Sequence, residues 1–126
     1  GSAENLPFED NSFDNVFCSF VWRNVSDTNK ALEEVHRVLK PGGKFILLDM
    51  TRPKNSFLKI WHKIGTFKVL HLIGLLTFNL KEYRFLYKSL DFYPQPENHL
   101  KKDTFIDLQI ERMGLFNFVY LAVFTK

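Results

Sequence analysis

The stretch FDNVFCSFVWRNVSDTNKALEEVHRVLKPGGKFILLDM, residues 13–50, decides the fold of this chain. It begins with a short apolar run at residues 13–20, which is typical of a β-strand. Residues 24–27 follow as a loop made of residue types that begin helices. Apolar residues then recur at helical spacing, at Ala31, Leu32, Val35, Val38 and Leu39. The first half of the stretch therefore predicts a strand, a loop and a helix.

The second half of the stretch ends the helix and starts another strand. We predict a helix over residues 28–40 that stops at Pro41-Gly42-Gly43, because proline cannot continue a helix and glycine accepts a positive φ. Residues 44–49 carry apolar side chains on both faces, as in a strand buried within a parallel sheet. Asp49 ends this strand, where it either contacts a ligand or caps the next turn. Two strands joined by a helix form a βαβ unit, so the chain is predicted to be an α/β protein.

Length, charge and cysteine usage exclude several classes of protein. The 126 residues suffice for one domain, and 45% hydrophobic against 25% charged residues indicates a folded chain. A net charge of +3 without lysine- or arginine-rich blocks argues against nucleic-acid binding. The single cysteine, Cys18, excludes an internal disulfide, fits a reducing compartment such as the cytoplasm, and is interpreted as a small core residue. No group of cysteines and histidines has the spacing of metal ligands, so we predict no metal site.

Three motifs together resemble one enzyme family. They are SAENLPFEDNSFD at residues 2–14, SFVWRNVSD at residues 19–27 and LEEVHRVLKPGGKFILLD at residues 32–49. With them the chain resembles the class I S-adenosylmethionine (SAM) methyltransferases. The pair Arg23-Asn24 and the later Tyr83 and Tyr93-Pro94 resemble, within that class, the ubiquinone/menaquinone-biosynthesis C-methyltransferases. The resemblance implies a Rossmann-like α/β sheet and SAM as the cofactor.

The resemblance covers only the C-terminal half of such an enzyme. The family's glycine-rich loop, which holds the methionine end of SAM, and the acidic residue that holds its ribose have no counterpart here. We therefore expect the C-terminal half of the sheet, with the first strand at an open edge. Such an edge predicts a homodimer formed by strand pairing, poor stability of the isolated chain, or completion by a missing N-terminal half.

The resemblance also implies positions for cofactor and substrate. It makes Arg23 the catalytic residue, which neutralises the negative charge that develops on a quinol-type substrate. The residues implied along the cofactor are Ser2, Ala3, Glu4, Ser19 and Phe20, and those implied at the substrate are Arg23, Asn24 and Tyr83.

Each of these positions also has a purely structural interpretation. Arg23 would pair with a carboxylate on the surface, and Asn24 would be a loop or cap residue. Residues 1–12 would form a surface turn anchored by Leu6 and Phe8. Tyr83 would pack against a neighbouring helix.

Residues 55–102 are predicted to form a helical, lid-like insertion. The sheet core is expected to comprise residues 1–54 and 103–126, and the whole of 1–126 forms one partial methyltransferase domain. A helix can begin at Asn55-Ser56, and an apolar stripe follows at Phe57, Ile60, Trp61 and Ile64. Residues 57–80 are interpreted as a lid over a hydrophobic substrate, as a peripheral contact with a membrane surface, or as a plainly packed helix pair. Residues 81–90 continue as another helix.

The C-terminal segment is predicted to depart from the family. We expect a last helix that begins at Asp103 or Thr104, ends at Met113 and is stopped by Gly114. Residues 115–125 then form one strand without a turn signal. The family instead closes its sheet with a hairpin of two strands.

Two functional hypotheses follow. The first is a SAM-dependent methyltransferase that acts on a small apolar or quinol-type acceptor with a lipid-like tail, inactive without its other half. The second is a non-catalytic, methyltransferase-like module that binds a protein partner or a membrane surface.

Overall fold

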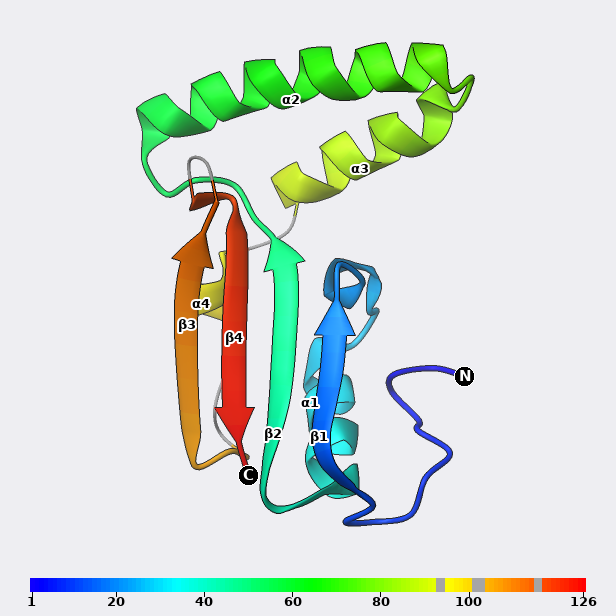
Figure 1. Cartoon of the computed structure of the whole chain (residues 1–126), viewed down its shortest axis with the longest axis vertical. Helices are drawn as coiled ribbons and strands as arrows, with labels where there is room; N and C mark the ends of the chain where they lie inside the picture. Colours follow the sequence, from blue (N-terminus) through cyan, green and yellow to red (C-terminus); the bar gives the residue numbers. More distant parts are fainter. Residues whose placement is uncertain (93–94, 101–103, 115–116) are drawn as a thin grey trace.

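A computed structural model describes residues 1–92, 95–100, 104–114 and 117–126. The elements in chain order are β1 (Phe13–Ser19), η1 (Trp22–Asn24), α1 (Thr28–Val38), β2 (Leu39–Met50), α2 (Ser56–Leu76), α3 (Leu80–Phe92), α4 (Pro96–His99), β3 (Asp107–Met113) and β4 (Val119–Thr125). The strands form one sheet of order β1-β2-β4-β3, in which β1 and β2 are parallel and β4 is antiparallel to both of its neighbours. Helices α2 and α3 form a hairpin beyond the carboxyl ends of β1 and β2 (Figure 1). This is the predicted α/β arrangement.

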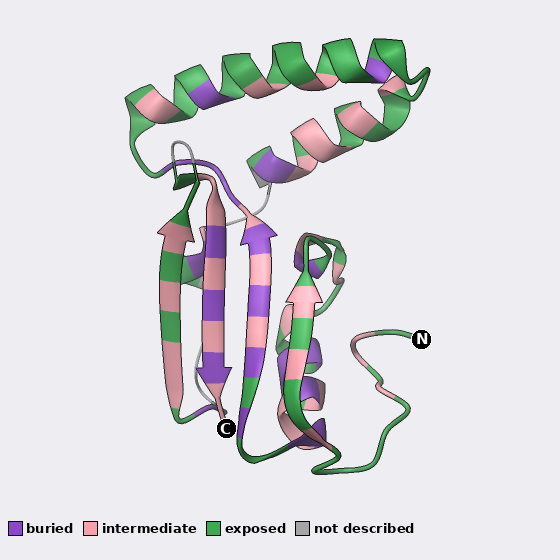
Figure 2. Cartoon of the chain, in the orientation of Figure 1, coloured by how far each residue is buried: buried purple, intermediate pink, exposed green. Residues whose placement is uncertain are grey.

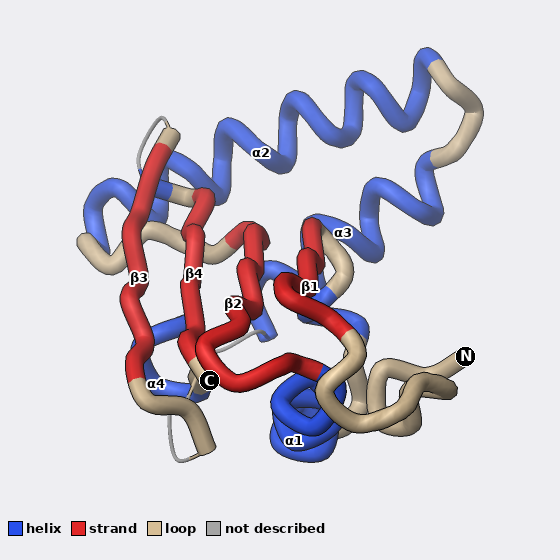
Figure 3. The backbone as a smooth tube through the Cα atoms, turned by 60° about the horizontal axis from the view of Figure 1, so that its bottom comes forward, coloured by secondary structure: helices blue, strands red, loops and turns tan. Residues whose placement is uncertain are grey.

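The hydrophobic core lies between α1 and one face of the sheet. Helix α1 begins where predicted, because Asp27 Oδ1 accepts hydrogen bonds from the backbone N–H groups of Asn29 (3.1 Å) and Lys30 (3.0 Å). Figure 3 shows α1 on one side of the sheet. The buried side chains that meet there come from α1, η1, β2 and β4 and include Trp22, Leu32, Val35, Phe45, Leu47, Tyr120 and Phe124. The period of the predicted helix therefore identified its buried face.

The opposite face of the sheet is covered much less. Phe17 of β1 is 72% exposed, and Ile46 and Leu48 of β2 are half-buried. We predicted that the strand at residues 44–49, now part of β2, would be buried on both faces. Within the described residues, however, no helix packs on this second face of the sheet. The strand order also leaves β1 at an edge of the sheet, with β2 as its neighbour. Both the open edge and the open face adjoin β1.

The turn Pro41-Gly42-Gly43 does not act as we predicted. Helix α1 already ends at Val38, and the three residues lie inside β2. The consequence is a shift in the register of the two strands. Phe13 of β1 pairs with Leu39 of β2, but Asn15 pairs with Lys44, so β2 contains extra residues between these two pairs. Gly42 has φ +78°, and a Cβ on Gly43 would lie 2.8 Å from the carbonyl oxygens of Asp14 and Lys40. The glycines therefore permit a close approach of the backbones of β1 and β2.

The predicted last helix is wrong. Residues 107–113 form β3, which pairs antiparallel with β4, and Gly114 has φ +81° in the turn that follows. Along β3 the half-buried Leu108 and Ile110 alternate with the exposed Gln109 and Glu111, which is the period of a strand. Position 103, predicted to cap the helix, and positions 115–116, predicted to begin a strand, lie outside the described residues. The strands β3 and β4 thus form the closing hairpin that is typical of the family, although we predicted that this chain would lack it.

The helical hairpin begins at the predicted N-cap. Asn55 Oδ1 accepts hydrogen bonds from the N–H groups of Phe57 (2.9 Å) and Leu58 (3.4 Å), and α2 then runs without a break for 21 residues. A Cβ on Gly74 would lie 3.1 Å from Leu80 Cα, so this glycine allows α2 and α3 to meet closely. Much of α2 is exposed (Figure 2). In the described part of the chain, no helix combines the length and apolar character needed to cross a membrane.

Candidate functional site

A buried ion pair joins η1, which follows β1, to the carboxyl end of β2. Asp49 is fully buried at the end of β2, and its Oδ1 lies 2.6 Å from Nη1 of Arg23 in η1. The other carboxylate oxygen accepts a hydrogen bond from the backbone N–H of Arg23 (3.1 Å). Arg23 therefore does not pair with a surface carboxylate, and Asp49 holds Arg23 in place. The only hydrogen bond of the Arg23 guanidinium to another described residue is the one to Asp49, so its further N–H groups can donate to a ligand.

The segment between β1 and η1 turns sharply. Ser19 is exposed at the end of β1, and Phe20 has φ +55°, an uncommon conformation for a residue with a side chain. The N–H of Phe20 donates to the carbonyl of Leu48 (2.8 Å), which keeps the turn against β2. The Phe20 ring is 43% exposed, and Asn24 is also exposed. Ligands bind outside the carboxyl ends of strands in open α/β sheets, so these side chains lie at the expected edge.

The N-terminal residues are fastened to the start of α1. Glu4 accepts hydrogen bonds from the backbone N–H of Asp27 (2.8 Å) and from the hydroxyl of Ser2 (2.9 Å). The first of these bonds is the main reason that the pKa of Glu4 is lowered. Ala3 packs against the hydrophobic core. Ser2, Ala3 and Glu4 thus form one small ordered unit.

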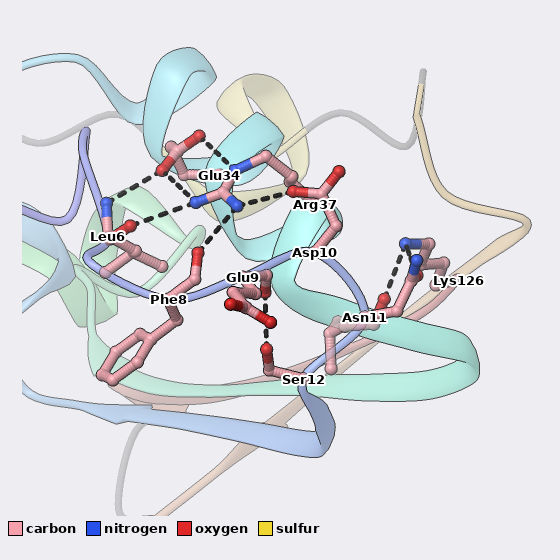
Figure 4. A network of polar contacts seen from close by, with 10 residues as sticks. Leu6, Phe8, Glu9, Asp10, Asn11, Ser12, Glu34, Arg37 and Lys126 are labelled. Carbon is pink, nitrogen blue, oxygen red and sulfur yellow. Dashed lines mark hydrogen bonds and ion pairs between the residues drawn. The ribbon is translucent and has the colours of Figure 1, made fainter.

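A polar network holds the rest of this segment on α1 (Figure 4). Arg37 donates to the carbonyls of Leu6 (3.0 Å) and Phe8 (2.8 Å) and to the carboxylate of Asp10 (2.7 Å). Glu34 accepts from the N–H of Leu6 (2.8 Å) and from Arg37, and the hydrogen bond from Arg37 is the main cause that lowers the pKa of Glu34 to about 2. Leu6 packs on the core as predicted, whereas Phe8 remains 49% exposed. The network fixes the path of the chain that leads into β1.

An apolar cavity of about 370 Å³ lies between α2, α3 and the ends of β2 and β4. Its lining residues are Met50, Trp61, His62, Gly65, Thr66, Val69, Leu70, Leu86, Leu90 and Phe118. Ligand-binding pockets are commonly of this size and apolar, with few polar groups. Tyr83, implied at the substrate by resemblance, lines a separate cavity of about 120 Å³ between α2 and α3. The two cavities lie on different sides of α3, since Leu86 and Leu90 face the larger one.

Arg52 connects this helical hairpin to the sheet. It is only 2% exposed and donates to Asp91 Oδ1 (3.1 Å), Thr66 Oγ1 (2.9 Å) and the carbonyl of Tyr87 (3.2 Å). Its Nη1 also lies 3.2 Å from Nδ1 of the buried His62. Burial alone would raise the pKa of Asp91, but the hydrogen bond from Lys63 and the charge of Arg52 outweigh it, so that pKa is lowered.

Sequence reasoning missed both Arg52 and His62. Neither was singled out from the sequence, in which Arg52 lies between a strand and a helix and His62 lies beside Lys63 in a helix. The signal that was available is the position of Arg52, directly after a buried strand, and it is weak.

The residues that could hold a cofactor lie on one side only. The exposed ring of Phe20 offers a surface on which a nucleobase can stack, beside the hydroxyl of Ser19. The buried indole N–H of Trp22, which follows in η1, has no hydrogen-bond partner among the described residues. The Phe20 ring and the Ser19 hydroxyl suit one side of a nucleoside at the end of β1, whereas the Trp22 indole is 1% exposed and lies in the core. Within the described residues, no group of three His, Cys, Asp or Glu side chains is placed to hold a metal ion.

Solved structures that superpose on this chain include SAM-dependent methyltransferases. A SAM-dependent methyltransferase from Thermotoga maritima superposes with a TM-score of 0.64 at 23% identity, covering 100% of this chain and 62% of that one. A protein from Pyrococcus horikoshii gives a TM-score of 0.58 at 21% identity, covering 99% and 59%. At these identities the similarity shows the fold, which is that of class I methyltransferases.

Sequence comparison is more specific. The Ubiquinone/menaquinone biosynthesis C-methyltransferase UbiE of Rickettsia bellii is 47% identical over 97 residues, which are 76% of this chain and 39% of that protein. Its counterpart in Rickettsia felis is 45% identical over the same length. The chain thus spans about two fifths of the length of the curated relatives it matches. Residues 1–120 match the sequence model of the ubiE/COQ5 methyltransferase family, and the chain therefore belongs to that family.

Proposed function

We propose that this chain forms the acceptor-binding part of a SAM-dependent methyltransferase whose acceptor is an apolar, quinol-type ring. The observation that carries the proposal is the apolar cavity of about 370 Å³ beside the end of β2. Met50 lines this cavity, and Asp49, which precedes it in β2, holds Arg23, so an ion pair and an apolar pocket both lie at the carboxyl end of β2. The names of the Rickettsia relatives support a quinone-type acceptor.

When bound, SAM supplies an electrophilic methyl group. In this chain Ser19 and Phe20 would lie along it, and Ser2, Ala3 and Glu4 would contact its adenine. Glu4 already accepts two hydrogen bonds, which keep its carboxylate in a fixed orientation. The remaining contacts would come from an N-terminal half, which β1, at the edge of the sheet, can pair with.

Arg23 would stabilise the negative charge on the oxygen of the acceptor ring. Its orientation is set by Asp49, because two hydrogen bonds tie that carboxylate to Arg23 and a third ties it to the N–H of Met50 (2.7 Å). The N–H groups that Asp49 leaves unused would donate to the oxygen, and Asn24 is the next residue of η1. A fixed donor costs no reorganisation when charge develops, which is why such groups accelerate reactions.

A chimera tests this proposal. The part of the Rickettsia bellii relative that precedes the matched region is placed before residue 1, and SAM binding and methyl transfer to a 1,4-naphthoquinol are measured. We expect binding and transfer in the chimera, and a loss of about 10²-fold in kcat with unchanged SAM affinity for Arg23→Gln. Arg23→Lys, which keeps the charge beside Asp49, controls for folding. A folded chimera that does not bind SAM would refute the proposal that this is a methyltransferase. A chimera that binds SAM but transfers no methyl group to the quinol would refute the proposed class of acceptor.

We also propose that the helical hairpin α2–α3 docks on an anionic membrane surface. On the outer side of α2, away from His62 and Thr66, lies a stripe of exposed apolar residues, namely Phe57, Ile64, Leu72 and Leu75, and Trp61 lies between this stripe and the cavity. Helix α3 exposes Lys81, Arg84 and Lys88, which share one face. Residues 56–90 hold six basic and one acidic side chain, a net +5 in a chain of net +3, so the rest carries −2. Exposed apolar and basic residues on one hairpin favour an anionic bilayer over an apolar protein partner.

Vesicle co-sedimentation tests the docking. We expect the chain to pellet with vesicles of phosphatidylcholine and phosphatidylglycerol, and weakly with phosphatidylcholine alone. Lys81→Glu with Lys88→Glu should release it, whereas the same charge change at Lys30 and Lys44, in the sheet region, should not. Equal binding to both vesicles, or to both double variants, would refute the docking. Concentration-dependent dimerisation through the hairpin would assign the surface to a second copy instead.

A further inference from the structure

The large apolar cavity contains one buried polar side chain whose role is not yet explained. His62 is 5% exposed, on the wall formed by α2. Its ring packs at 5.1 Å from the ring of Phe118, with an angle of 33° between the planes, which restricts its rotation. The neighbouring polar residue, Thr66, is one turn further along α2.

The hydroxyl of Thr66 is already committed. It donates to the carbonyl of His62 (2.7 Å) and accepts from Nη1 of Arg52 (2.9 Å). Thr66 therefore fixes Arg52 rather than serving a ligand.

The contact with Arg52 decides which nitrogen of His62 carries the proton. Arg52 Nη1 lies 3.2 Å from His62 Nδ1, and a guanidinium can only donate. Nδ1 must accept, so the hydrogen of the neutral ring is on Nε2. Burial, and then the charge of Arg52, lower the pKa of His62, which keeps the ring neutral near pH 7. Arg52 cannot turn away, because Asp91 and the carbonyl of Tyr87 bind its other nitrogens.

The Nε2–H of His62 has no hydrogen-bond partner within the described residues, although it borders an apolar cavity. A ring that fills the cavity and excludes water would leave this N–H unpaired, which is costly, unless the ring itself supplies an acceptor atom. We propose that His62 donates this hydrogen bond to a ring oxygen of the acceptor and so selects an oxygen-bearing aromatic ring over a hydrocarbon of the same shape. The inference rests on the proposed function, since it takes the cavity to be the acceptor site. His62 would orient the ring, and Arg23 would remain the group that meets the developing charge.

Two ring probes of the same shape test the proposal on the full chain. Trp61 lines the cavity and is 59% exposed, whereas Trp22 is buried in the core, so quenching by 2-methyl-1,4-naphthoquinone reports occupancy through Trp61. The affinity for 2-methylnaphthalene, which lacks the oxygens, is obtained by competition. We expect the quinone to bind about five- to tenfold more tightly than the hydrocarbon, the difference that one hydrogen bond makes.

Variants of His62 separate the hydrogen bond from the packing. His62→Phe keeps a ring against Phe118 and should lose the five- to tenfold preference while binding 2-methylnaphthalene as before. His62→Gln, whose amide can donate from a similar position, should restore part of it. Nitrogen-15 spectra of the histidine ring should show the Nε2–H form.

The outcomes distinguish this inference from the proposed function. A His62→Phe variant that keeps the preference for the quinone, or an Nδ1–H ring, would overturn the role of His62 and leave the cavity as the acceptor site. A wild-type chain that binds neither probe would overturn the acceptor site itself, and the role of His62 with it. Unchanged circular dichroism and retained hydrocarbon binding serve as the test of folding for each variant.

Discussion

The sheet region and the helical hairpin α2–α3 place their apolar side chains in opposite ways. Phe45 of β2 and Phe124 of β4 are fully buried and stacked at 5.5 Å, while Phe57 at the start of α2 is 67% exposed. Figure 2 shows buried positions along β2 and β4 and mostly exposed positions along α2. Apolar packing stabilises the sheet region, whereas the hairpin is attached to it by hydrogen bonds and ion pairs at Arg52. The two regions should therefore respond differently to mutation, and the two tryptophans, Trp22 in the sheet region and Trp61 in the hairpin, report on them separately.

The largest expected effect is a cavity in the sheet core. Phe45→Ala should lower the free energy of unfolding by about 3–5 kcal/mol, because Phe45 is fully buried against Trp22 and Phe124. Phe57→Ala should change it by less than about 0.5 kcal/mol, since that ring is mostly in solvent. Urea unfolding followed by the fluorescence of single-tryptophan variants measures both. Equal losses at the two phenylalanines would contradict the contrast between the regions.

The next effect is at the junction. Arg52→Met should destabilise the hairpin by about 2–4 kcal/mol, because it leaves His62 Nδ1, the carbonyl of Tyr87 and part of Asp91 without a donor. The Trp61 signal should then change at lower urea than the Trp22 signal. Lys54→Met is the matched control, since its ion pair with Glu97 is exposed and contributes under about 1 kcal/mol. Coincident transitions in Arg52→Met would mean that the hairpin is held by packing instead.

Helix caps sharpen the same comparison at lower amplitude. Asp27→Ala removes the N-cap of α1 and should cost about 1 kcal/mol in the Trp22 transition, since α1 covers the core. Asn55→Ala removes the N-cap of α2 and should cost about as much, but in the Trp61 transition. The conservative variants Asp27→Asn and Asn55→Asp, which keep a capping side chain, should lose much less stability than the alanine variants. A loss that appears in the other region's signal would show that the two regions unfold together.

The smallest expected effect is a pH dependence in the sheet region. The hydrogen bond from Arg112 is the main cause that lowers the pKa of Glu97 from 4.5 to about 2, and it ties α4 to β3 (2.8 Å). Because the folded chain binds this proton less readily than the unfolded chain, the stabilisation is complete above pH 4.5 and is lost as the pH falls toward 2. Glu97→Gln should cost under about 1 kcal/mol at pH 7. Its free energy of unfolding should converge with that of the wild type near pH 2, and a constant difference between pH 7 and pH 2 would contradict the assignment.

Much of the first half of the fold could be predicted because its signals are local. The strand at β1, the helix α1 and the N-cap at Asn55 follow from apolar period and capping residues that lie within a few positions of each other. The hairpin β3–β4 could not be predicted in this way. The residues of β3 alternate weakly, with Leu108 and Ile110 only half-buried, and what holds β3 in place is its pairing with β4, which no local pattern contains.

The same division applies to the candidate site. The sequence by itself determined the family resemblance, the position of Arg23 at the end of β1 and the apolar stripe of α2. Only the tertiary structure decided that Asp49 is the partner of Arg23, that His62 turns into the cavity and that the stripe faces outward. The physical reason is that periodicity shows which side chains share a face of a helix, whereas the side that is buried depends on contacts with distant residues such as Arg52 and Phe118.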